Sequence, residues 1–254
     1  MSPARGFRFD DQVVLVTGAA RGIGRAAALE FAACGAKVIL NYQVSATEAR
    51  AVAAQITEAG GEAETIRADV RDARAVSNMV GQVLQRYGRI DVLVNNAGIV
   101  RDALTPMMND EEWDDVLAVN AAGPFRVARA VARPMLLARR GRIINVSSVA
   151  ATKGGRGQAN YAASKAALEG FTRALAVELA PKGILVNAVA PGVITTEMSR
   201  RVREEAGAEV LSKILLRRYG TAEEIAGVIA FLASDAASYI TGAVIPVDGG
   251  FKLE

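Results

Sequence analysis

The sequence of 254 residues contains no histidine and a single cysteine, Cys34. Without an imidazole, neither a Ser-His-Asp nor a Cys-His nucleophile can form, and zinc sites that depend on histidine are excluded. One cysteine allows no disulfide within the chain and no metal site built from several thiolates. We therefore expect no metal site, and proton transfer must rely on tyrosine, lysine, carboxylates, hydroxyl groups or water.

Aromatic residues and net charge are also scarce. Aromatics make up 5% of the chain, and the net charge is only +3, from 30 basic and 27 acidic residues that are largely interleaved. This composition argues against a nucleic-acid stacking surface. The chain has no apolar run of about 18 residues, and residues 1–11 are polar rather than apolar as in a signal peptide. We expect a cytoplasmic protein with no nucleic-acid partner and no membrane partner.

Short apolar runs alternate with helical patterns along the whole chain. The runs are rich in β-branched and aliphatic residues, as in strands buried on both faces, and cover residues 13–17, 37–41, 64–68, 92–95, 142–147, 185–190 and 243–247. The helical patterns cover residues 22–34, 46–59, 73–87, 111–138, 161–180 and 222–233. This alternation predicts an α/β fold: a Rossmann-like, doubly wound parallel sheet of seven strands with helices on both faces, as a single domain over residues 1–254.

Ligands of such sheets bind outside the carboxyl ends of the strands. In this sequence the expected strand ends carry the residues of most chemical interest, which are Gly18, Asn41, Asp69, Asn95, Ser147, Ser148 and Pro191. Because all these ends meet at one edge of a parallel sheet, we expect the functional site to lie there.

A glycine-rich loop, Thr-Gly-Ala-Ala-Arg-Gly-Ile-Gly at residues 17–24, follows the first strand and opens a helix. Gly18, Gly22 and Gly24 permit a tight turn and close approach to a pyrophosphate, while the helix start at Ile23 offers free N–H groups. The spacing G-x-x-x-G-x-G differs from the common dinucleotide fingerprint. The loop predicts a dinucleotide site, and the alternative is a tight strand–helix turn without a ligand.

The end of the second strand indicates which dinucleotide binds. NAD sites usually place an acidic residue there for the ribose 2′-hydroxyl, but this strand ends in Asn41 and Tyr42, with no acid until Glu48. The missing carboxylate removes a repulsion toward a 2′-phosphate. Arg21 and Ser45 can face that phosphate, although a solvated surface arginine is the alternative for Arg21. The sequence therefore predicts NADP(H).

Tyr161 and Lys165 stand four positions apart at the start of a helical pattern, and so share one face of the helix. An ammonium beside a phenol favours the phenolate, so we expect the pKa of Tyr161 to be lowered from about 10. Such a tyrosine is a usable acid or base where no histidine exists. A surface Tyr–Lys pair is the alternative.

Two more polar residues fit this chemistry. Ser148 lies thirteen residues before Tyr161, just past an expected strand, where its hydroxyl can hold a carbonyl oxygen; Ser147 is the competing candidate. Asn120 lies among apolar residues of a helical pattern and needs a partner if it is buried. It can hold a water that links Lys165 to solvent, or it can be a satisfied core asparagine.

Taken together, these motifs resemble the short-chain dehydrogenase/reductase family along nearly the whole chain. The matching elements are residues 17–24, Asp69-Val70, Asn95-Asn96-Ala97-Gly98, Asn120, Ser148, Tyr161 with Lys165, and Pro191-Gly192. Within the family, residues 158–165, 186–192 and 247–250 look most like the 3-oxoacyl-[acyl-carrier-protein] reductases.

The resemblance implies a role for each matching residue. Tyr161 would protonate the developing alkoxide, Lys165 would lower the pKa of Tyr161 and bond the nicotinamide ribose, Ser148 would orient the carbonyl, and Asn120 would hold a proton-relay water. Asp69 and Val70 would contact adenine. The remaining cofactor contacts would come from Asn95, Ala97, Gly98, Pro191, Gly192, Ile194 and Thr196.

The resemblance also implies partners. Residues 197–219 would cover the substrate, and a homotetramer is expected. Basic residues there suit an acidic acyl carrier protein or a CoA phosphate, and carrier docking would use Arg139, Lys182 and the arginines at 200, 201, 203, 217 and 218. Because Glu204, Glu205 and Glu209 are interspersed, a solvated, salt-bridged surface is the alternative.

The sequence thus predicts an oxidoreductase of fatty-acid biosynthesis that uses NADPH to reduce a 3-oxoacyl thioester, linked to acyl carrier protein or CoA, to the 3-hydroxyacyl thioester. One alternative is a relative acting on another ketone or alcohol, such as acetoacetyl-CoA, a sugar, a steroid or a small diketone. Another is a non-catalytic, NADPH-binding regulatory or structural protein, against which the complete set of catalytic residues argues.

Overall fold

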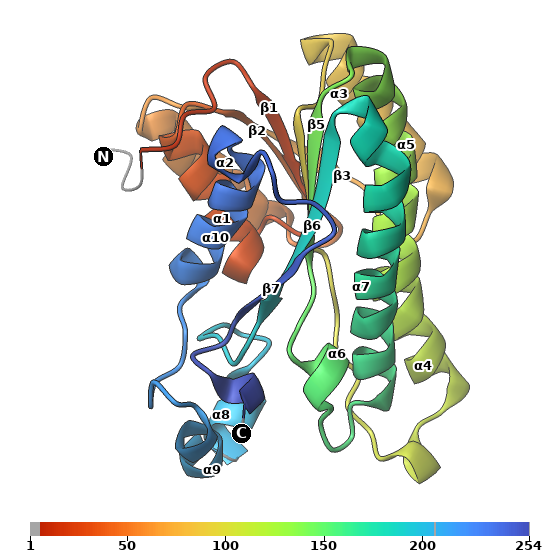
Figure 1. Cartoon of the computed structure of the whole chain (residues 1–254), viewed down its shortest axis with the longest axis vertical. Helices are drawn as coiled ribbons and strands as arrows, with labels where there is room; N and C mark the ends of the chain where they lie inside the picture. The colour runs from red at the N-terminus through yellow and green to blue at the C-terminus, as the bar shows by residue number, and fades with distance from the viewer. Residues whose placement is uncertain (1–5, 206, 254) are drawn as a thin grey trace.

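A single parallel sheet forms the centre of the computed structural model, which describes residues 6–205 and 207–253 (Figure 1). Its seven strands are all parallel, as the sequence predicts, and the structure adds their order, which is β3-β2-β1-β4-β5-β6-β7. The strands are β1 (Val13–Val16), β2 (Lys37–Tyr42), β3 (Glu62–Arg67), β4 (Val92–Asn95), β5 (Gly141–Val146), β6 (Ile184–Pro191) and β7 (Val244–Val247).

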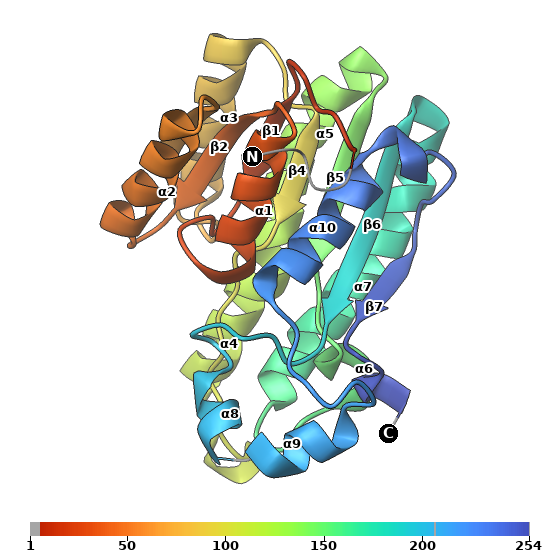
Figure 2. The same ribbon diagram turned by 90° about the vertical axis from the view of Figure 1, so that its left-hand side faces the viewer.

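Helices cover both faces of this sheet. Figures 1 and 2 show α1, α2 and α10 on one face and α3, α5 and α7 on the other. The helices are α1 (Gly22–Ala33), α2 (Ala46–Glu58), α3 (Ala73–Tyr87), α4 (Asp110–Leu117), α5 (Gly123–Ala138), α6 (Ala150–Lys153), α7 (Ala159–Leu179), α8 (Arg200–Glu205), α9 (Gly207–Lys213) and α10 (Ala222–Ala233).

The central strand shows why a continuous apolar run is needed here. Successive side chains of β1 point to opposite faces of the sheet. Val14 and Val16 pack into the core beneath α1 and α10, whereas Val13 and Leu15 pack into the core beneath α3 and α5. All four side chains are buried, and each such burial stabilises the fold by about 1.5–3 kcal/mol.

Two of the differences from the sequence expectation have a clear physical reason. The strand expected at 64–68 begins at Glu62, because β3 is an edge strand whose half-exposed start tolerates charge, and Glu62 lies opposite Lys37. The helix expected at 111–138 is divided into α4, a π-helical turn η2 (Ala118–Ala122) and α5. The 3.6-residue hydrophobic period of a helix does not reveal from the sequence that one turn is widened into a π-helical turn.

The end of the molecule at the carboxyl ends of the strands is built from short elements. Helices α6, α8 and α9 and the C-terminal residues gather there, below the sheet in Figures 1 and 2. In residues 6–205 and 207–253, no helix combines the length and apolarity that crossing a membrane requires.

Candidate active site

The glycine-rich loop after β1 adopts a backbone that side chains would block. Gly18 and Gly22 have φ angles of +63° and +55°, in the left-handed region that favours glycine. A Cβ atom at Gly18 would lie 2.9 Å from the Cα of Ala97, and one at Gly24 would lie 2.4 Å from the carbonyl oxygen of Gly18. The predicted tight turn is therefore present, and it leads directly into α1, where Ile23 is the second residue.

Asn96 fixes this loop to the end of β4. Its Nδ2 donates hydrogen bonds to the carbonyl oxygens of Thr17 (2.9 Å) and Gly18 (3.0 Å). In return, the hydroxyl of Thr17 accepts from the main-chain N–H groups of Asn96 and Ala97. Sequence reasoning quoted Asn96 within a motif but gave it no role; its position at a strand end beside the glycine loop is the signal that could have found it.

The segment after β6 lies against the glycine loop. A Cβ atom at Gly22 would be 3.5 Å from Cγ2 of Thr196. Ile194, two residues before Thr196, is buried. Gly192, just past Pro191, must be glycine because a Cβ there would come within 2.8 Å of Asp248. These loops meet as the two sides of a cradle above the strand ends.

This cradle suits a dinucleotide. Left-handed glycines let a pyrophosphate approach the backbone, and the N-terminus of α1, a helix of twelve residues, supplies free N–H groups. The glycine loop would hold the pyrophosphate, with the Thr196 segment over it and Lys165 beyond. The residues present therefore fit the nicotinamide cofactor that the sequence predicts.

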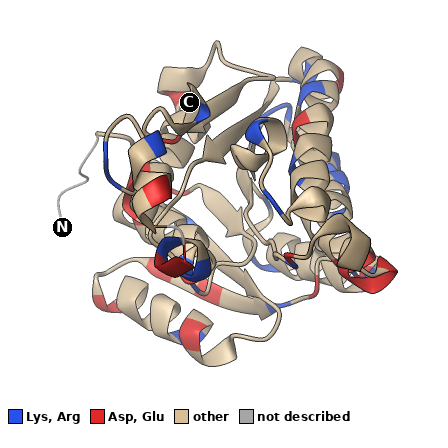
Figure 3. Ribbon diagram, turned by 90° about the horizontal axis from the view of Figure 1, so that it is seen from below, with Lys and Arg blue, Asp and Glu red and all other residues tan. Residues whose placement is uncertain are grey.

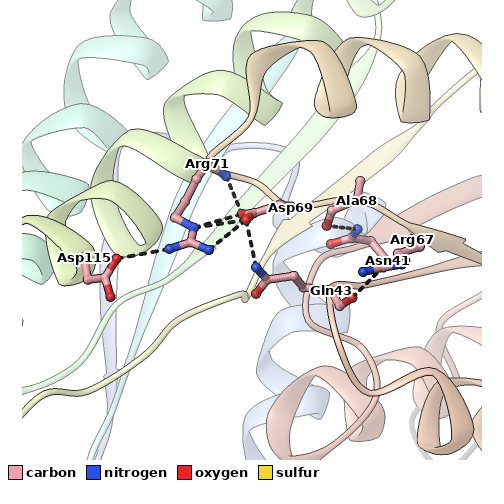
Figure 4. A network of polar contacts seen from close by, with 7 residues as sticks. All are labelled: Asn41, Gln43, Arg67, Ala68, Asp69, Arg71 and Asp115. Carbon is pink, nitrogen blue, oxygen red and sulfur yellow. Dashed lines mark hydrogen bonds and ion pairs between the residues drawn. The ribbon is translucent and has the colours of Figure 1, made fainter.

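Asp69, expected at the adenine, lies after β3 and accepts hydrogen bonds from two side chains. Gln43 Nε2 donates at 2.7 Å, and the guanidinium of Arg71 donates from Nε and Nη2 at 3.0 and 2.9 Å (Figure 4). Burial raises the pKa of Asp69, but the hydrogen bonds from Arg71 and Gln43 outweigh it and hold the pKa below its usual value. Asp69 is thus a stable carboxylate acceptor.

Asn41, expected at the ribose phosphate, uses its side chain to bond the neighbouring strand end. Its side chain is buried and donates to the main-chain carbonyl of Ala68 at 3.0 Å. The exposed residue at the end of β2 is Gln43, which the sequence reasoning did not select. Tyr42 is half-buried, Ser45 is the N-cap residue of α2, and Arg21 is exposed at the N-cap of α1.

Two other residues predicted to contact the cofactor, Asn95 and Val70, have buried side chains. Asn95 is buried and donates to Oδ1 of Asn145 at 2.9 Å, on the side of the sheet covered by α5 and α7. Val70 is buried against the start of α5, where a Cβ on Gly123 would lie 2.8 Å from its Cγ2. The side chain of Val70 therefore packs against α5, and a polar contact to adenine from this residue would have to come from its main chain.

The structure brings together Ser148, Tyr161 and Lys165. The hydroxyl of Ser148 hydrogen-bonds the phenol of Tyr161 and accepts from the N–H of Ala150. Lys165 is 4% exposed; its ammonium donates to the carbonyl of Val146 at 2.8 Å and lies 5.7 Å from the centre of the Tyr161 ring. The carboxyl end of β5 and the first turns of α7 hold these groups in place.

The expected lowering of the Tyr161 pKa is wrong for this arrangement. Burial raises the pKa of the phenol, and the hydrogen bond from Ser148 opposes this only in part. Burial also lowers the pKa of Lys165 to about 8. The phenol is therefore protonated near neutral pH, as a proton donor must be, while Lys165 still carries its charge.

Asn120 occupies the π-helical turn and is fully buried. Its Oδ1 accepts from the N–H of Ile99, and its Nδ2 donates to the carbonyl of Ile99 and to the hydroxyl of Ser164. Ser164 in turn donates to the carbonyl of Tyr161 at 2.7 Å. These bonds satisfy the Asn120 amide. A Cβ at Gly98 would lie 3.3 Å from the Asn120 oxygen and 3.6 Å from Nζ of Lys165, so Asn120 lies close to Lys165.

Ser147, the competing serine, bonds further along α7, where its hydroxyl reaches the main-chain carbonyl of Lys165 at 3.4 Å. Its hydroxyl is buried and donates to Oε1 of Glu169 on α7 at 3.0 Å. Ser148 is therefore the serine that meets Tyr161.

The arginines of residues 200–218 are paired within the chain. Figure 3 looks onto this end of the molecule and shows acidic and basic residues intermixed. Three arginines form ion pairs with glutamates and two bond main-chain carbonyls: Arg200 with Glu197, Arg201 with Glu205, Arg218 with Glu224, Arg203 with Thr196 and Arg217 with Ser212. This arrangement matches the salt-bridged alternative better than a free docking surface.

Arg139 and Lys182 are exposed neighbours at the other end of the sheet. Arg139 precedes β5 and Lys182 precedes β6, so both lie at amino ends of strands, opposite Tyr161. A Cβ on Gly183 would lie 2.5 Å from the carbonyl oxygen of Arg139, which places the two segments in contact. Within one chain, these residues do not rim the active site.

Known proteins resemble the chain over almost its whole length. A family model described as "Enoyl-(Acyl carrier protein) reductase" matches residues 18–252. The chain is 51% identical to a 3-oxoacyl-[acyl-carrier-protein] reductase from Synechocystis, over 95% of the chain and 97% of that protein. It is 46% identical to 3-oxoacyl-[acyl-carrier-protein] reductase FabG of Escherichia coli, over 96% of the chain and 99% of that protein.

A solved structure is similarly close. One described as an NAD(P)-dependent gluconate 5-dehydrogenase from Beutenbergia cavernae, with bound NADP, has a TM-score of 0.93 and 39% identity. The match covers 98% of this chain and 99% of that one. Sequence and fold therefore agree on the same group of oxidoreductases.

Proposed function

The chain belongs to the short-chain dehydrogenase/reductase family, and from that membership we propose that it reduces 3-oxoacyl thioesters to 3-hydroxyacyl thioesters with NADPH. The observation that carries the proposal is the Ser148–Tyr161–Lys165 group beside the glycine-rich loop, in a chain about half identical to curated 3-oxoacyl-[acyl-carrier-protein] reductases. The complete group disfavours a non-catalytic binding protein.

The chain's own residues manage the proton. The nicotinamide cofactor, when bound, supplies a hydride to the carbonyl carbon. Ser148 donates a hydrogen bond to the carbonyl oxygen and so orients it. As that oxygen gains negative charge, the Tyr161 phenol transfers its proton to it, which leaves a hydroxyl on the substrate and a phenolate on the enzyme.

Lys165 stabilises the phenolate that remains. Its buried ammonium, 5.7 Å from the ring centre, favours the charged form of Tyr161 after the transfer. Asn120 fixes Ile99 and Ser164 around this group through three hydrogen bonds. The relay water that the family resemblance implies would return a proton to Tyr161 from solvent through this region.

NADPH is the proposed cofactor because the adenine end lacks an acid on β2. The exposed residue at the end of that strand is the neutral Gln43, and Arg21 is exposed at the start of α1. A 2′-phosphate would therefore meet no carboxylate from β2 and would have a cation nearby. The similar solved structure with bound NADP supports this choice.

The proposed carrier-protein contact requires more than one copy of the chain. A carrier docked on Arg139 and Lys182 lies at the far end of the sheet from Tyr161 of the same chain. It can deliver its substrate only if a second copy places its own active site nearby. Exposed apolar side chains on α5 and α7, such as Leu137 and Val177, support the homotetramer proposed from the family resemblance.

A second candidate substrate is a sugar acid. It is favoured by the structural neighbour described as a gluconate 5-dehydrogenase, although its 39% identity is lower than that of the thioester reductases. The two candidates share the catalytic group and differ in the substrate that the loop between β6 and α10 must cover.

The test is NADPH oxidation with acetoacetyl thioesters of acyl carrier protein and CoA, compared with 5-oxogluconate. Thioester turnover at least tenfold above the sugar acid is expected, and the reverse order would favour the second candidate. Tyr161→Phe is expected to lower turnover by about 10²–10⁴-fold, as loss of a general acid does, with NADPH binding retained. Full turnover by this variant would refute the assignment.

A further inference from the structure

Arg71 stands between the adenine end of the site and helix α4. One edge of its guanidinium forks onto Asp69, through Nε at 3.0 Å and Nη2 at 2.9 Å, and its own main-chain N–H bonds Oδ1 at 2.9 Å. Its remaining nitrogen, Nη1, donates to Oδ1 of Asp115 on α4 at 3.0 Å (Figure 4). A forked arginine–carboxylate contact is directional as well as charged.

The Asp69 carboxylate is therefore held by donors from two segments, one after β2 and one after β3. Gln43, after β2, donates to the same carboxylate, while Arg71 approaches from the turn after β3. Because Asp69 is the residue that the family resemblance places on adenine, this cluster fixes the direction in which it can accept a further hydrogen bond.

Helix α4 leads from this cluster to the catalytic group. Asp115 lies on α4, and α4 continues without a break into the π-helical turn that carries Asn120. Asn120 bonds Ser164, which bonds the carbonyl of Tyr161. A second, apolar contact joins the same regions, since Val70 packs against Gly123 at the start of α5.

We propose that Arg71 is a positioning residue that ties the adenine-binding carboxylate Asp69 to α4, so that binding of the adenosine part of the cofactor stabilises the helix carrying Asn120. This inference rests on the proposed function. A hydrogen bond from adenine to Asp69 would share the carboxylate oxygens that Arg71 contacts, and Arg71 cannot shift without changing its contact with Asp115. Coupling between two sites is carried by contiguous hydrogen bonds and rigid elements. Here the contacts run from Asp69 through Arg71 and Asp115 to α4.

The probe is adenosine 2′,5′-bisphosphate, which has the adenine and the 2′-phosphate but no nicotinamide. Amide hydrogen exchange, read by mass spectrometry, is compared with and without the probe at matched site occupancy. In the wild type, the probe is expected to slow exchange at least threefold both in residues 17–24 and in residues 110–122.

Variants separate coupling from binding. Arg71→Ala is expected to keep the protection of 17–24 and lose that of 110–122. Asp115→Ala should give the same loss while binding the probe within threefold of wild type, because it removes only the α4 contact. Arg86→Ala is the matched control: Arg86 is another exposed arginine, paired with Glu64 at 3.2 Å, and it should behave as wild type.

Protection of 110–122 that survives in Asp115→Ala would overturn the proposal, as would failure of the wild type to bind the probe. If Arg71→Ala does not fold, Asp115→Ala decides alone. These readouts do not depend on any substrate. An enzyme that fails to reduce thioesters but shows the exchange difference would refute the proposed function and retain the role of Arg71.

Discussion

Lys165 carries a charge in a nearly closed site, and this makes its proton the most sensitive feature of the catalytic group. Burial lowers its pKa to about 8, so the ammonium is present below that pH and is lost above it. We predict that kcat/KM for NADPH, which reports the free enzyme, is level up to about pH 8 and falls toward tenfold per unit above it. Initial rates from pH 6 to 10 measure this profile.

The control for this profile is Lys153→Ala. Lys153 is partly exposed at the end of α6, over the ring of Phe251, and its loss should leave the pH dependence unchanged. A wild-type profile that stays level to pH 10 would contradict the assignment of the transition to Lys165.

The neutral side chain of Gln43 is expected to support NADPH preference. Gln43→Glu places a carboxylate beside Asp69 and near the 2′-phosphate, where like charges repel. We predict at least a tenfold fall in the NADPH-to-NADH ratio of kcat/KM. Gln55→Glu on α2 is the matched control, because the side chain of Gln55 accepts a hydrogen bond from the exposed Arg25, away from Asp69 in the sequence and on another element. An unchanged ratio would place the 2′-phosphate elsewhere.

Sequence reasoning brought Ser148, Tyr161 and Lys165 together correctly because their spacing is set by one helix and one strand end. Tyr161 and Lys165 share a face of α7, and Ser148 follows β5 as expected. It did not reveal that the side chain of Asn41 is buried and bonded to Ala68, since position in the pleat decides which way a strand-end side chain points. It also reversed the pKa shift of Tyr161, because burial, which no local pattern reveals, raises this pKa by more than the hydrogen bond with Ser148 lowers it.

At the scale of elements, the junction between the glycine loop and β4 depends on Asn96. Asn96→Ala removes two hydrogen bonds and leaves the carbonyls of Thr17 and Gly18 without these donors. At about 0.5–1.5 kcal/mol for each bond, we predict a loss of roughly 1–3 kcal/mol in the free energy of unfolding, together with weaker NADPH binding. Urea denaturation and fluorescence titration measure the two effects.

Asn109→Ala provides the comparison for Asn96→Ala. Asn109 caps α4 through Glu112, so its loss should cost about 1 kcal/mol of stability without weakening NADPH binding. Equal effects of both substitutions on NADPH binding would contradict a specific role for Asn96 in the loop.

The elements themselves were predictable to different degrees. Strands β1, β2 and β4 are apolar on both faces, and their runs stand out in the sequence. The π-helical turn at 118–122 could not be predicted, because it depends on the bonds that Asn120 makes with Ile99, which lies outside the helix. The contact between Arg71 and Asp115 likewise joins segments that only the folded chain brings together.

For the whole molecule, carrier docking and catalysis are expected to depend on different ends of the sheet. We predict that Arg139→Glu combined with Lys182→Glu raises KM for acetoacetyl-[acyl-carrier-protein] at least fivefold, because an acidic partner is then repelled. KM for acetoacetyl-CoA should change less than twofold. Steady-state kinetics with both thioesters test this, with Arg86→Glu as control, and equal effects on both substrates would refute docking at these residues.

The strand order also governs how the chain reaches its native state. β1 is made first, yet it lies inside the sheet, where Val14 pairs with Val38 on one side and with Val92 on the other. Every neighbouring pair in this parallel sheet needs a crossover, so no hairpin can form early and large loops must close before the strands associate. The half containing β1, β2 and β3 can assemble during synthesis, but its apolar edge stays uncovered until β4 emerges. We therefore expect slow folding with a collapsed intermediate, for which chaperones would compete with aggregation.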